Sequence, residues 1–222
     1  MVLVLLFVFV LGKYIFKYSQ IKEVSGSQMD VESVVKEELK KVALTFDDGP
    51  HYKYTEVLLD GLLKRNVQVT FFVTGEHAEL HPDLVLRMYQ EGHLVGNHTY
   101  SHIQLKSDNK ESFKKELLLT NEILKEIGGE EIVFVRPPYG SWDKALEKEL
   151  NMIPVFWTVD PMDWCGGSVQ EIVDKTLSKV EEGSVILLHD YFENSVEGAL
   201  QIIDTMVEQG YCFVTVEELL FD

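Results

Sequence analysis

The chain has 222 residues, of which 45% are apolar and 11% aromatic, so it can fill the core of one good-sized domain. Its formal net charge of −17 argues against a nucleic-acid-binding protein, because phosphate backbones are bound by an excess of lysine and arginine. Cys165 and Cys212 are too few for a disulfide scaffold, and the sequence does not settle whether they pair.

The first 16 residues are strongly apolar. Residues 2–11 contain no polar side chain, and the apolar character returns at residues 14–16. This stretch is shorter than the roughly 20 residues of a spanning helix. No basic residue precedes it and no clear cleavage site follows it, although its length suits a signal peptide. We expect an uncleaved membrane anchor over residues 1–16 in preference to a buried strand, a polar linker over 17–39, and a domain over 40–222.

Short apolar runs alternate with segments of helical periodicity from residue 42 to the end. The expected strand-then-helix units are 42–46 with 54–65, 67–73 with 76–91, 93–97 with 111–127, 132–135 with 142–150, 153–159 with 169–181, 184–188 with 196–209, and 212–216 with 217–221. The strands are apolar throughout, which indicates a parallel sheet buried on both faces. A doubly wound sheet and a (β/α) barrel both fit, and seven units without a Gly-x-Gly-x-x-Gly turn favour the barrel.

Polar clusters follow five of the expected strands. They are Asp47 with Asp48, His98 with His102, Arg136 to Gly140, Asp160 to Trp164, and His189 with Asp190. The carboxyl ends of parallel strands meet at one rim of the sheet, whereas independent solvated turns would scatter over both ends. The pattern therefore predicts a functional site on that rim.

The first cluster predicts a cation. Asp47 and Asp48 end an apolar strand, and Gly49-Pro50 prevents the strand from continuing. Two adjacent buried carboxylates repel each other, and one takes up a proton unless a cation lies beside them. A solvated Asp-Asp-Gly-Pro turn would be the simpler interpretation if this hexapeptide stood alone.

Two histidines supply further ligands for such a cation. His98 and His102 are four residues apart, and one helical turn would place both imidazoles on the same side. Together with Asp47 or Asp48 they make a suitable set for a divalent ion with open positions. The remaining histidines are expected to be surface or packing residues: His51, His77, His81 and His93.

The five clusters resemble the motifs of the NodB-homology polysaccharide deacetylases, carbohydrate esterase family four. The matching motifs are Thr-Phe-Asp-Asp-Gly-Pro, His-Thr-x-x-His, Arg-Pro-Pro-Tyr-Gly, Asp-x-x-Asp-Trp and Leu-Leu-His-Asp, in the family's order. The resemblance covers about residues 40–222. It implies an α/β fold with a distorted (β/α)7 barrel and a hydrolase that removes N-acetyl groups from polysaccharides.

The resemblance also implies different roles for the two adjacent aspartates. Asp48, His98 and His102 would hold one divalent ion, with zinc as the expected metal, although cobalt or nickel suits the same ligands. Asp47 would be the general base that takes a proton from the attacking water. Arg136 and the ion would keep this carboxyl ionised beside another acid.

By the same resemblance His189 would be the general acid that protonates the leaving nitrogen, with Asp163 as its carboxylate partner. The backbone N–H of Tyr139 would complete an oxyanion hole. Trp164 and Leu187 would line the pocket for the acetyl methyl group, and core packing is a second interpretation of these two residues.

One departure from the family pattern concerns substrate preference. Cys165-Gly166-Gly167 follows Trp164, where a basic or polar residue is common in relatives. The catalytic set is intact, but the groove beside it differs. Asp160 and Asp190 are interpreted as groups that stiffen loops or support the site from behind.

The expected substrate is cell-wall peptidoglycan, deacetylated at its N-acetylglucosamine units outside the cytoplasm. A flexible tether of about 25 residues lets a domain range only some 25 to 30 Å, so an anchored enzyme would act near the membrane. A released form, N-acetylmuramic acid and surface poly-N-acetylglucosamine remain open. The alternatives are an O-acetyl esterase on acetylated xylan and a catalytically silent glycan-binding member, although no motif is broken.

Overall fold

The computed structural model describes residues 39–129 and 131–221, and the chain from Leu39 onward forms one compact unit. The expected anchor and nearly all of the expected linker lie outside these residues. Every helix in the described part of the chain is too short or too polar to span a membrane.

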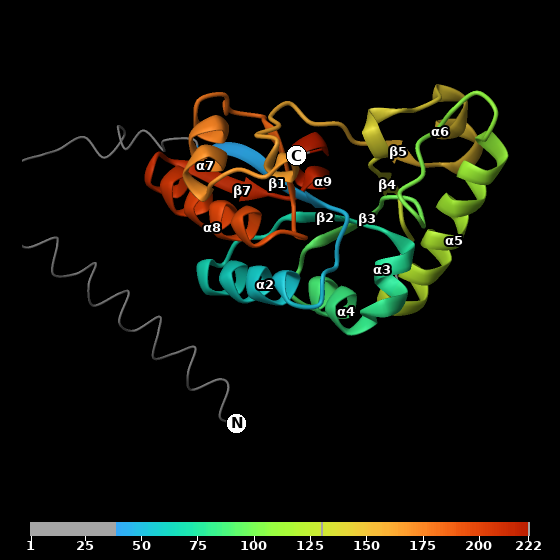
Figure 1. Ribbon diagram of the computed structural model, residues 1–222, viewed down its shortest axis with the longest axis horizontal. Coiled ribbons are helices and arrows are strands. Elements are labelled where there is room, and N and C mark those ends of the chain that lie inside the picture. The colour runs from blue at the N-terminus through green and yellow to red at the C-terminus, as the bar shows by residue number, and fades with distance from the viewer. Residues whose placement is uncertain (1–38, 130, 222) are drawn as a thin grey trace, which may run out of the picture. The chain divides into compact units, whose positions relative to one another are not determined.

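Seven parallel strands form one sheet. They are β1 (Lys40–Asp47), β2 (Thr70–Val73), β3 (Leu94–Asn97), β4 (Phe134–Val135), β5 (Ile153–Pro154), β6 (Val185–His189) and β7 (Tyr211–Val214). The strand order is β5-β4-β3-β2-β1-β6, and β7 pairs with the first half of β1. This order confirms the seven expected units and places β1 between β2 and β6 (Figure 1).

A single bridge joins the two ends of this order. The backbone of Val159, in the segment after β5, pairs in parallel with Ile186 of β6, and Leu187 donates its N–H to the Val159 carbonyl at 2.9 Å. The sheet therefore closes through one irregular contact, and the expected distorted (β/α)7 barrel is confirmed.

This irregular contact corrects the expected fifth strand. Residues 153–159 were expected to form one strand, but β5 contains only Ile153 and Pro154. Pro154 has no N–H to donate, so regular pairing cannot continue through it on both edges. The chain leaves the regular sheet after β5 and returns to it at Thr158 and Val159, which bond to β6.

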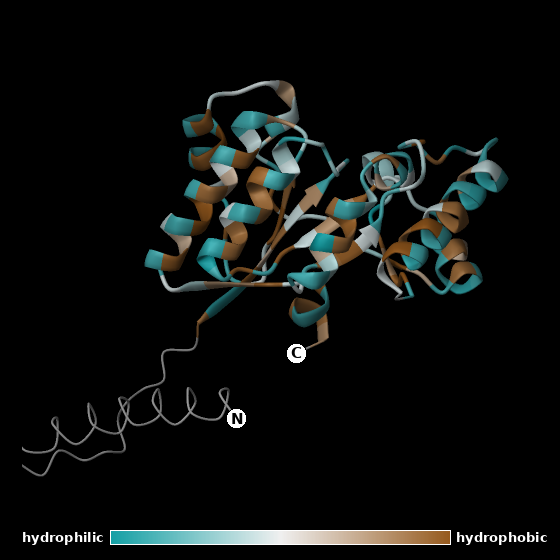
Figure 2. Cartoon of the chain, turned by 90° about the horizontal axis from the view of Figure 1, so that it is seen from below, coloured by the Kyte–Doolittle hydropathy of each residue, from teal (hydrophilic) through white to brown (hydrophobic). Residues whose placement is uncertain are grey.

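Helices cover the outside of the sheet. They are α2 (Tyr54–Arg65), α3 (Gly75–Leu80), α4 (Pro82–Gln90), α5 (Lys110–Gly128), α6 (Lys144–Leu150), α7 (Val169–Leu177), α8 (Glu193–Glu208) and α9 (Val216–Phe221), with 3-10 turns η2 (Pro138–Gly140) and η3 (Asp163–Cys165). Apolar and polar residues alternate along these helices (Figure 2). This is the pattern expected of a helix that packs one side against a sheet and exposes the other.

One expected helix is in fact two. Residues 76–91 were expected to form a single helix, but the helix is interrupted at His81, whose φ of −136° and ψ of 56° are not helical. Pro82 is the reason, because its ring disfavours helical geometry in the preceding residue and suits the first turn of a new helix. The break leaves the short helix α3 beside the end of β2, where it takes part in the site.

The two faces of β1 have different surroundings. Val42, Leu44 and Phe46 pack in the main core, which includes apolar residues of α2, α4, α7 and α8. Ala43 instead belongs to a smaller interior cluster with Phe72, Phe134, Val155, Val185 and Val216. Val216 begins α9, so this last helix covers the barrel at the end where β1 begins. The opposite end, where Asp47 emerges, is left open for a site.

Candidate metal centre and active site

A cavity of about 260 Å³ opens at the carboxyl ends of the strands. Its lining residues are Asp47, Asp48, His98, His102, Pro137, Tyr139, Trp157, Asp160, Trp164, Leu187 and His189. All five polar clusters found in the sequence contribute to it. Of the ten expected site residues, eight line the cavity, and Arg136 and Asp163 contact two of them from behind.

Asp47 is the last residue of β1 and forms a buried ion pair with Arg136. The Arg136 Nη1 donates to Asp47 Oδ1 at 2.8 Å and to Thr45 Oγ1 at 2.6 Å, and its Nε donates to the Val155 carbonyl at 3.2 Å. The guanidinium also lies 4.3 Å from the centre of the Phe72 ring. Burial lowers the pKa of Arg136, and the charge of Asp47 opposes this effect. Regular strands on both sides therefore hold the Asp47 carboxylate against a fixed counter-charge.

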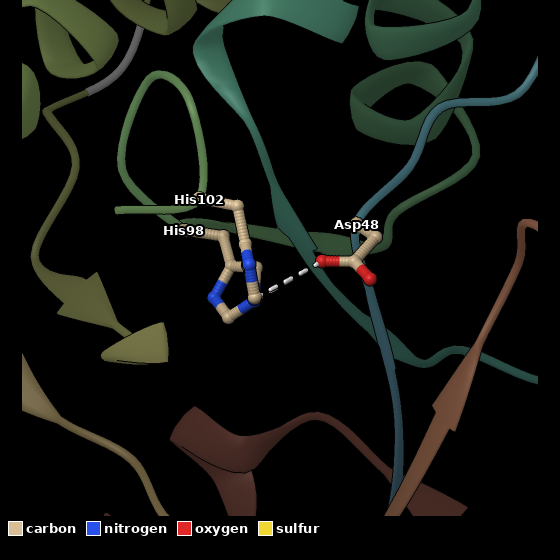
Figure 3. A group of neighbouring side chains, drawn as sticks. All are labelled: Asp48, His98 and His102. Atoms are coloured by element: carbon tan, nitrogen blue, oxygen red, sulfur yellow. Dashed lines mark ion pairs between the residues drawn. The ribbon is translucent and has the colours of Figure 1, made fainter. Parts of the chain in front are cut away.

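Asp48, His98 and His102 form a set of possible metal ligands (Figure 3). Asp48 Oδ1 lies 3.4 Å from His98 Nε2 and 3.5 Å from His102 Nε2. Two ligand atoms bound tetrahedrally to Zn²⁺ at 2.0–2.2 Å are roughly 3.4 Å apart. Asp48 Oδ1 is buried without a hydrogen-bond partner, which is the situation a bound cation would resolve.

The ring orientation of His98 agrees with this assignment. Its Nδ1–H donates to the Arg136 carbonyl at 2.6 Å, so the lone pair of Nε2 faces Asp48. Burial raises the pKa of Asp48, but the imidazole of His98, 3.4 Å from Oδ1, and the charges of His102 and His189 outweigh it and lower the pKa to about 2. Burial and the charge of His98 lower the pKa of His102. These two shifts favour the ligating forms of Asp48 and His102, a carboxylate and a neutral imidazole. Burial lowers the pKa of His98, but the charges of Asp47 and Asp48 outweigh it and raise this pKa.

The segment from His98 to His102 is a loop, which corrects the expected helical turn. Thr99 and His102 have φ values of 63° and 55°, in the left-handed region that non-glycine residues seldom adopt. Asn97, at the end of β3, supports the loop because its Oδ1 accepts from the Thr99 N–H at 2.7 Å and its Nδ2 donates to the Leu117 carbonyl at 2.8 Å. The two rings still meet, with centroids 4.8 Å apart.

His189 ends β6 and is held by Asp163. The imidazole Nδ1 lies 2.9 Å from Asp163 Oδ1, and the His189 N–H donates to Asp163 Oδ2 at 2.8 Å. Burial lowers the pKa of His189, but the hydrogen bond and charge of Asp163 and the charges of Asp47 and Asp48 raise it to about 9. The protonated ring points its Nε2 toward the metal ligands, 3.9 Å from Asp48 Oδ2.

Tyr139, Trp164 and Leu187 surround the same cavity. Tyr139 lies in η2 with a left-handed φ of 59°, and its ring contacts His102 at a centroid distance of 4.8 Å. Trp164 is 51% exposed, so core packing does not explain it, whereas Leu187 is buried in β6. The tryptophan thus forms an outer wall of the cavity and the leucine part of its base.

Asp160 and Asp190, which were expected to play supporting roles, both accept hydrogen bonds. Asp160 Oδ1 accepts from the Met162 N–H at 2.7 Å, which stiffens the loop as expected. Asp190 is fully buried and accepts from Thr55 Oγ1, and burial raises its pKa to about 7. Cys165 and Cys212 are both free thiols, so no disulfide joins them.

His77 is a site residue that the sequence analysis missed. Its Nδ1 lies 2.6 Å from the main-chain carbonyl of Asp48, and it lines a second cavity of about 250 Å³ that also includes Asp48 and His102. The sequence analysis expected a surface or packing role for His77 and did not anticipate this contact, whereas His93 is buried against Phe71 as expected. The only signal was its place just after the second strand, on the same rim.

The chain is similar to several known proteins. Residues 35–155 match the family model "Polysaccharide deacetylase". A peptidoglycan N-acetylglucosamine deacetylase of Bacillus cereus is 40% identical over 81% of this chain and 68% of the relative. The peptidoglycan N-acetylmuramic acid deacetylase PdaC of Bacillus subtilis is 38% identical over 85% of this chain and 40% of the relative, so the chain spans less than half of that protein.

The solved structures agree with this similarity. The structure of Bacillus subtilis PdaC has a TM-score of 0.79 and 38% identity, and the match covers 82% of this chain and 90% of the solved one. The chain therefore belongs to the polysaccharide deacetylase family.

Proposed function

We propose that this protein is a metal-dependent N-deacetylase of cell-wall peptidoglycan that acts on N-acetylglucosamine units. One observation carries the proposal: a single cavity combines a three-ligand metal set, a carboxylate paired with a buried arginine, and a histidine paired with a buried carboxylate. These three parts can supply the Lewis acid, the proton acceptor and the proton donor for hydrolysis of an amide.

Asp48, His98 and His102 would hold the ion, and their donor set of one carboxylate and two imidazoles suits Zn²⁺. When bound there, the ion would act as a Lewis acid toward the acetyl carbonyl and lower the pKa of a water molecule. Three protein ligands leave positions open for both partners.

Asp47 would accept the proton of the attacking water. Its Oδ1 is occupied by Arg136, and its Oδ2 lies 3.7 Å from His98 Nε2, so this second oxygen faces the ligand set. Arg136 fixes the orientation of the carboxylate and balances its charge. Positioned proton transfer of this kind contributes about 10²- to 10⁴-fold to a rate.

His189 would donate a proton to the leaving nitrogen, which is a poor leaving group without it. Asp163 fixes Nδ1 as a donor, so Nε2 carries the transferable proton into the cavity. The backbone N–H of Tyr139 would stabilise the developing oxyanion, and Trp164 with Leu187 would receive the acetyl group.

The names of the relatives support peptidoglycan as the polymer, and they include both of its sugars. The shape of the rim supports a polymer as well, because the two cavities share Asp48 and His102 and extend away from the ligands on different sides. Residues 1–16 would anchor the protein, and residues 17–39 would tether the domain outside the cytoplasm within reach of the wall.

Mass spectrometry of muropeptides after incubation with the purified Zn²⁺-loaded protein tests this proposal. Loss of one acetyl mass from the glucosamine unit supports it. Loss from the muramic acid unit would retain the activity class and change the sugar. Unaltered muropeptides, combined with rapid acetate release from acetylated xylan, would favour the esterase.

Substitution of His189 provides a second way to distinguish an amidase from an esterase. An ester oxygen leaves with less protonation than an amide nitrogen. The substitution His189→Ala should therefore reduce acetate release from an N-acetylated glycan far more than release from an O-acetylated one. Equal losses on both substrates would argue against His189 as the acid for the nitrogen.

A further inference from the structure

The main chain of Asp48 has an unfavourable conformation. Its φ of 72° lies in the left-handed region, and it is the first residue after β1, where no ladder hydrogen bond holds it. Such a conformation costs about 1–3 kcal/mol and persists only where surrounding contacts enforce it. These contacts also decide where the Asp48 carboxylate points.

Residues after β2 provide contacts on one side. His77, in α3, has its Nδ1 2.6 Å from the Asp48 carbonyl oxygen. A carbonyl can only accept, so Nδ1 carries the proton and donates it, and Thr74 Oγ1 lies 2.9 Å from the same nitrogen. The next carbonyl along, that of Gly49, accepts from the Thr74 N–H at 3.2 Å. Two successive carbonyls are thus held by one short segment of chain.

A buried carboxylate closes the other side. Asp190 packs against Gly49 so tightly that a Cβ atom at Gly49 would lie 2.2 Å from both carboxylate oxygens. Asp190 is fully buried and accepts from Thr55 Oγ1, so it has little room to move. The Asp48–Gly49 segment is therefore held between Asp190 and His77.

We propose that His77 is a positioning residue of the metal centre: its hydrogen bond holds the Asp48 main chain in the left-handed conformation that directs the carboxylate to His98 and His102. This inference rests on the proposed function, because it requires Asp48 to be a metal ligand. Loss of the hydrogen bond lets Asp48 relax toward a commoner φ and moves its Oδ1 away from the two Nε2 atoms.

The test is the Zn²⁺ affinity of the whole chain, measured by competition with a chromophoric chelator. Supporting partners of metal ligands typically contribute 10- to 100-fold to metal affinity. His77→Ala should therefore weaken Zn²⁺ binding by about 10-fold or more. His77→Asn should restore most of the loss, because its amide nitrogen can donate from nearly the position of Nδ1.

His81→Ala is the matched control. This histidine is in the same segment, beyond α3, and its ring contacts Tyr52 rather than the Asp48 carbonyl. It should bind Zn²⁺ as the unchanged protein does. Thermal unfolding of each metal-free variant checks that His77→Ala remains folded.

The outcomes separate this inference from the function on which it rests. An unchanged protein that binds no Zn²⁺ would overturn the metal centre itself. An unchanged protein that binds Zn²⁺ no more tightly than folded His77→Ala would overturn the role of His77 alone. A loss that His77→Asn fails to restore would show that the ring, and not its hydrogen bond, is responsible, and would also overturn the proposal.

Discussion

The two halves of the site are built in different ways. Asp47 and Arg136 lie at or directly after strand ends, are almost completely buried, and are joined by one hydrogen bond of 2.8 Å. Asp48 and His102 lie on loops, have left-handed φ values, and have side chains about one-third exposed at 33% and 32%. The base side is fixed by regular structure, and the metal-ligand side is held by long-range contacts to loops.

The two halves differ in how far their geometry depends on a bound metal ion. The ion pair between Asp47 and Arg136 has its counter-charge within the protein, so its geometry does not depend on a metal ion. Asp48 Oδ1, by contrast, is buried without a hydrogen-bond partner, and a bound metal ion would supply the missing partner. We therefore expect substitutions on the base side to change chemistry or folding, and substitutions on the ligand side to change metal binding.

The largest expected effect separates the two adjacent aspartates. Asp47→Asn should reduce turnover by about 10²- to 10⁴-fold and keep its metal, because the proton acceptor is lost and the ligands remain. Asp48→Asn should lose both metal and turnover. Elemental analysis and acetate release measured on the same samples check this contrast. Loss of metal from Asp47→Asn would make Asp47 a ligand and remove the distinction between the halves.

The second effect concerns folding. Arg136→Met should destabilise the metal-free protein by about 3–5 kcal/mol, because it leaves the buried Asp47 carboxylate without its counter-charge. The double variant Arg136→Met with Asp47→Asn should recover part of this stability. His102→Gln, on the partly exposed loop, should change the free energy of unfolding by less than about 1 kcal/mol. Urea denaturation of the three proteins measures these differences, and equal losses would contradict the comparison.

The third effect concerns the pH dependence of turnover. The acid form of His189 is present below its pKa of about 9 and is lost as the pH rises through that value. Asp163 is the main group that raises this pKa, so Asp163→Asn should move the alkaline decline of kcat to lower pH and reduce kcat at its optimum by about 10²-fold. The pH profile of acetate release measures both changes. An unshifted alkaline limb would show that His189 does not limit turnover there.

The smallest expected effect tests the contacts that hold the ligand loop. Gly49→Ala places a Cβ atom 2.2 Å from the fully buried Asp190 carboxylate, so the loop must move. We expect Zn²⁺ affinity to fall by about 10-fold, while the Asp47–Arg136 pair stays in place. Gly167→Ala is a suitable control, because its new Cβ atom would come no closer than 3.3 Å to another group, the end of the Glu171 side chain. Unchanged affinity in Gly49→Ala would mean that the loop tolerates displacement.

The sequence by itself determined the order of the strands along the chain and the rim at which the site lies. Continuous apolar runs ended by acids, histidines or Arg-Pro-Pro identify the carboxyl ends of buried parallel strands, and these ends meet because the strands are parallel. The resemblance to the deacetylase family then named the ligands and the proton donor and acceptor.

Only the tertiary structure decided how the loops are shaped and which distant groups support them. The left-handed conformations of Asp48, Thr99, His102 and Tyr139 are intrinsically unfavourable, so local pattern does not predict them. Arg136 reaches Thr45 across 91 positions, and Thr55 reaches Asp190 across 135. His77 contacts Asp48 because α3 begins directly after β2 and because β1 and β2 are neighbours. Such contacts depend on the assembled sheet, since the free energy that holds a strained loop comes from residues far away in the sequence.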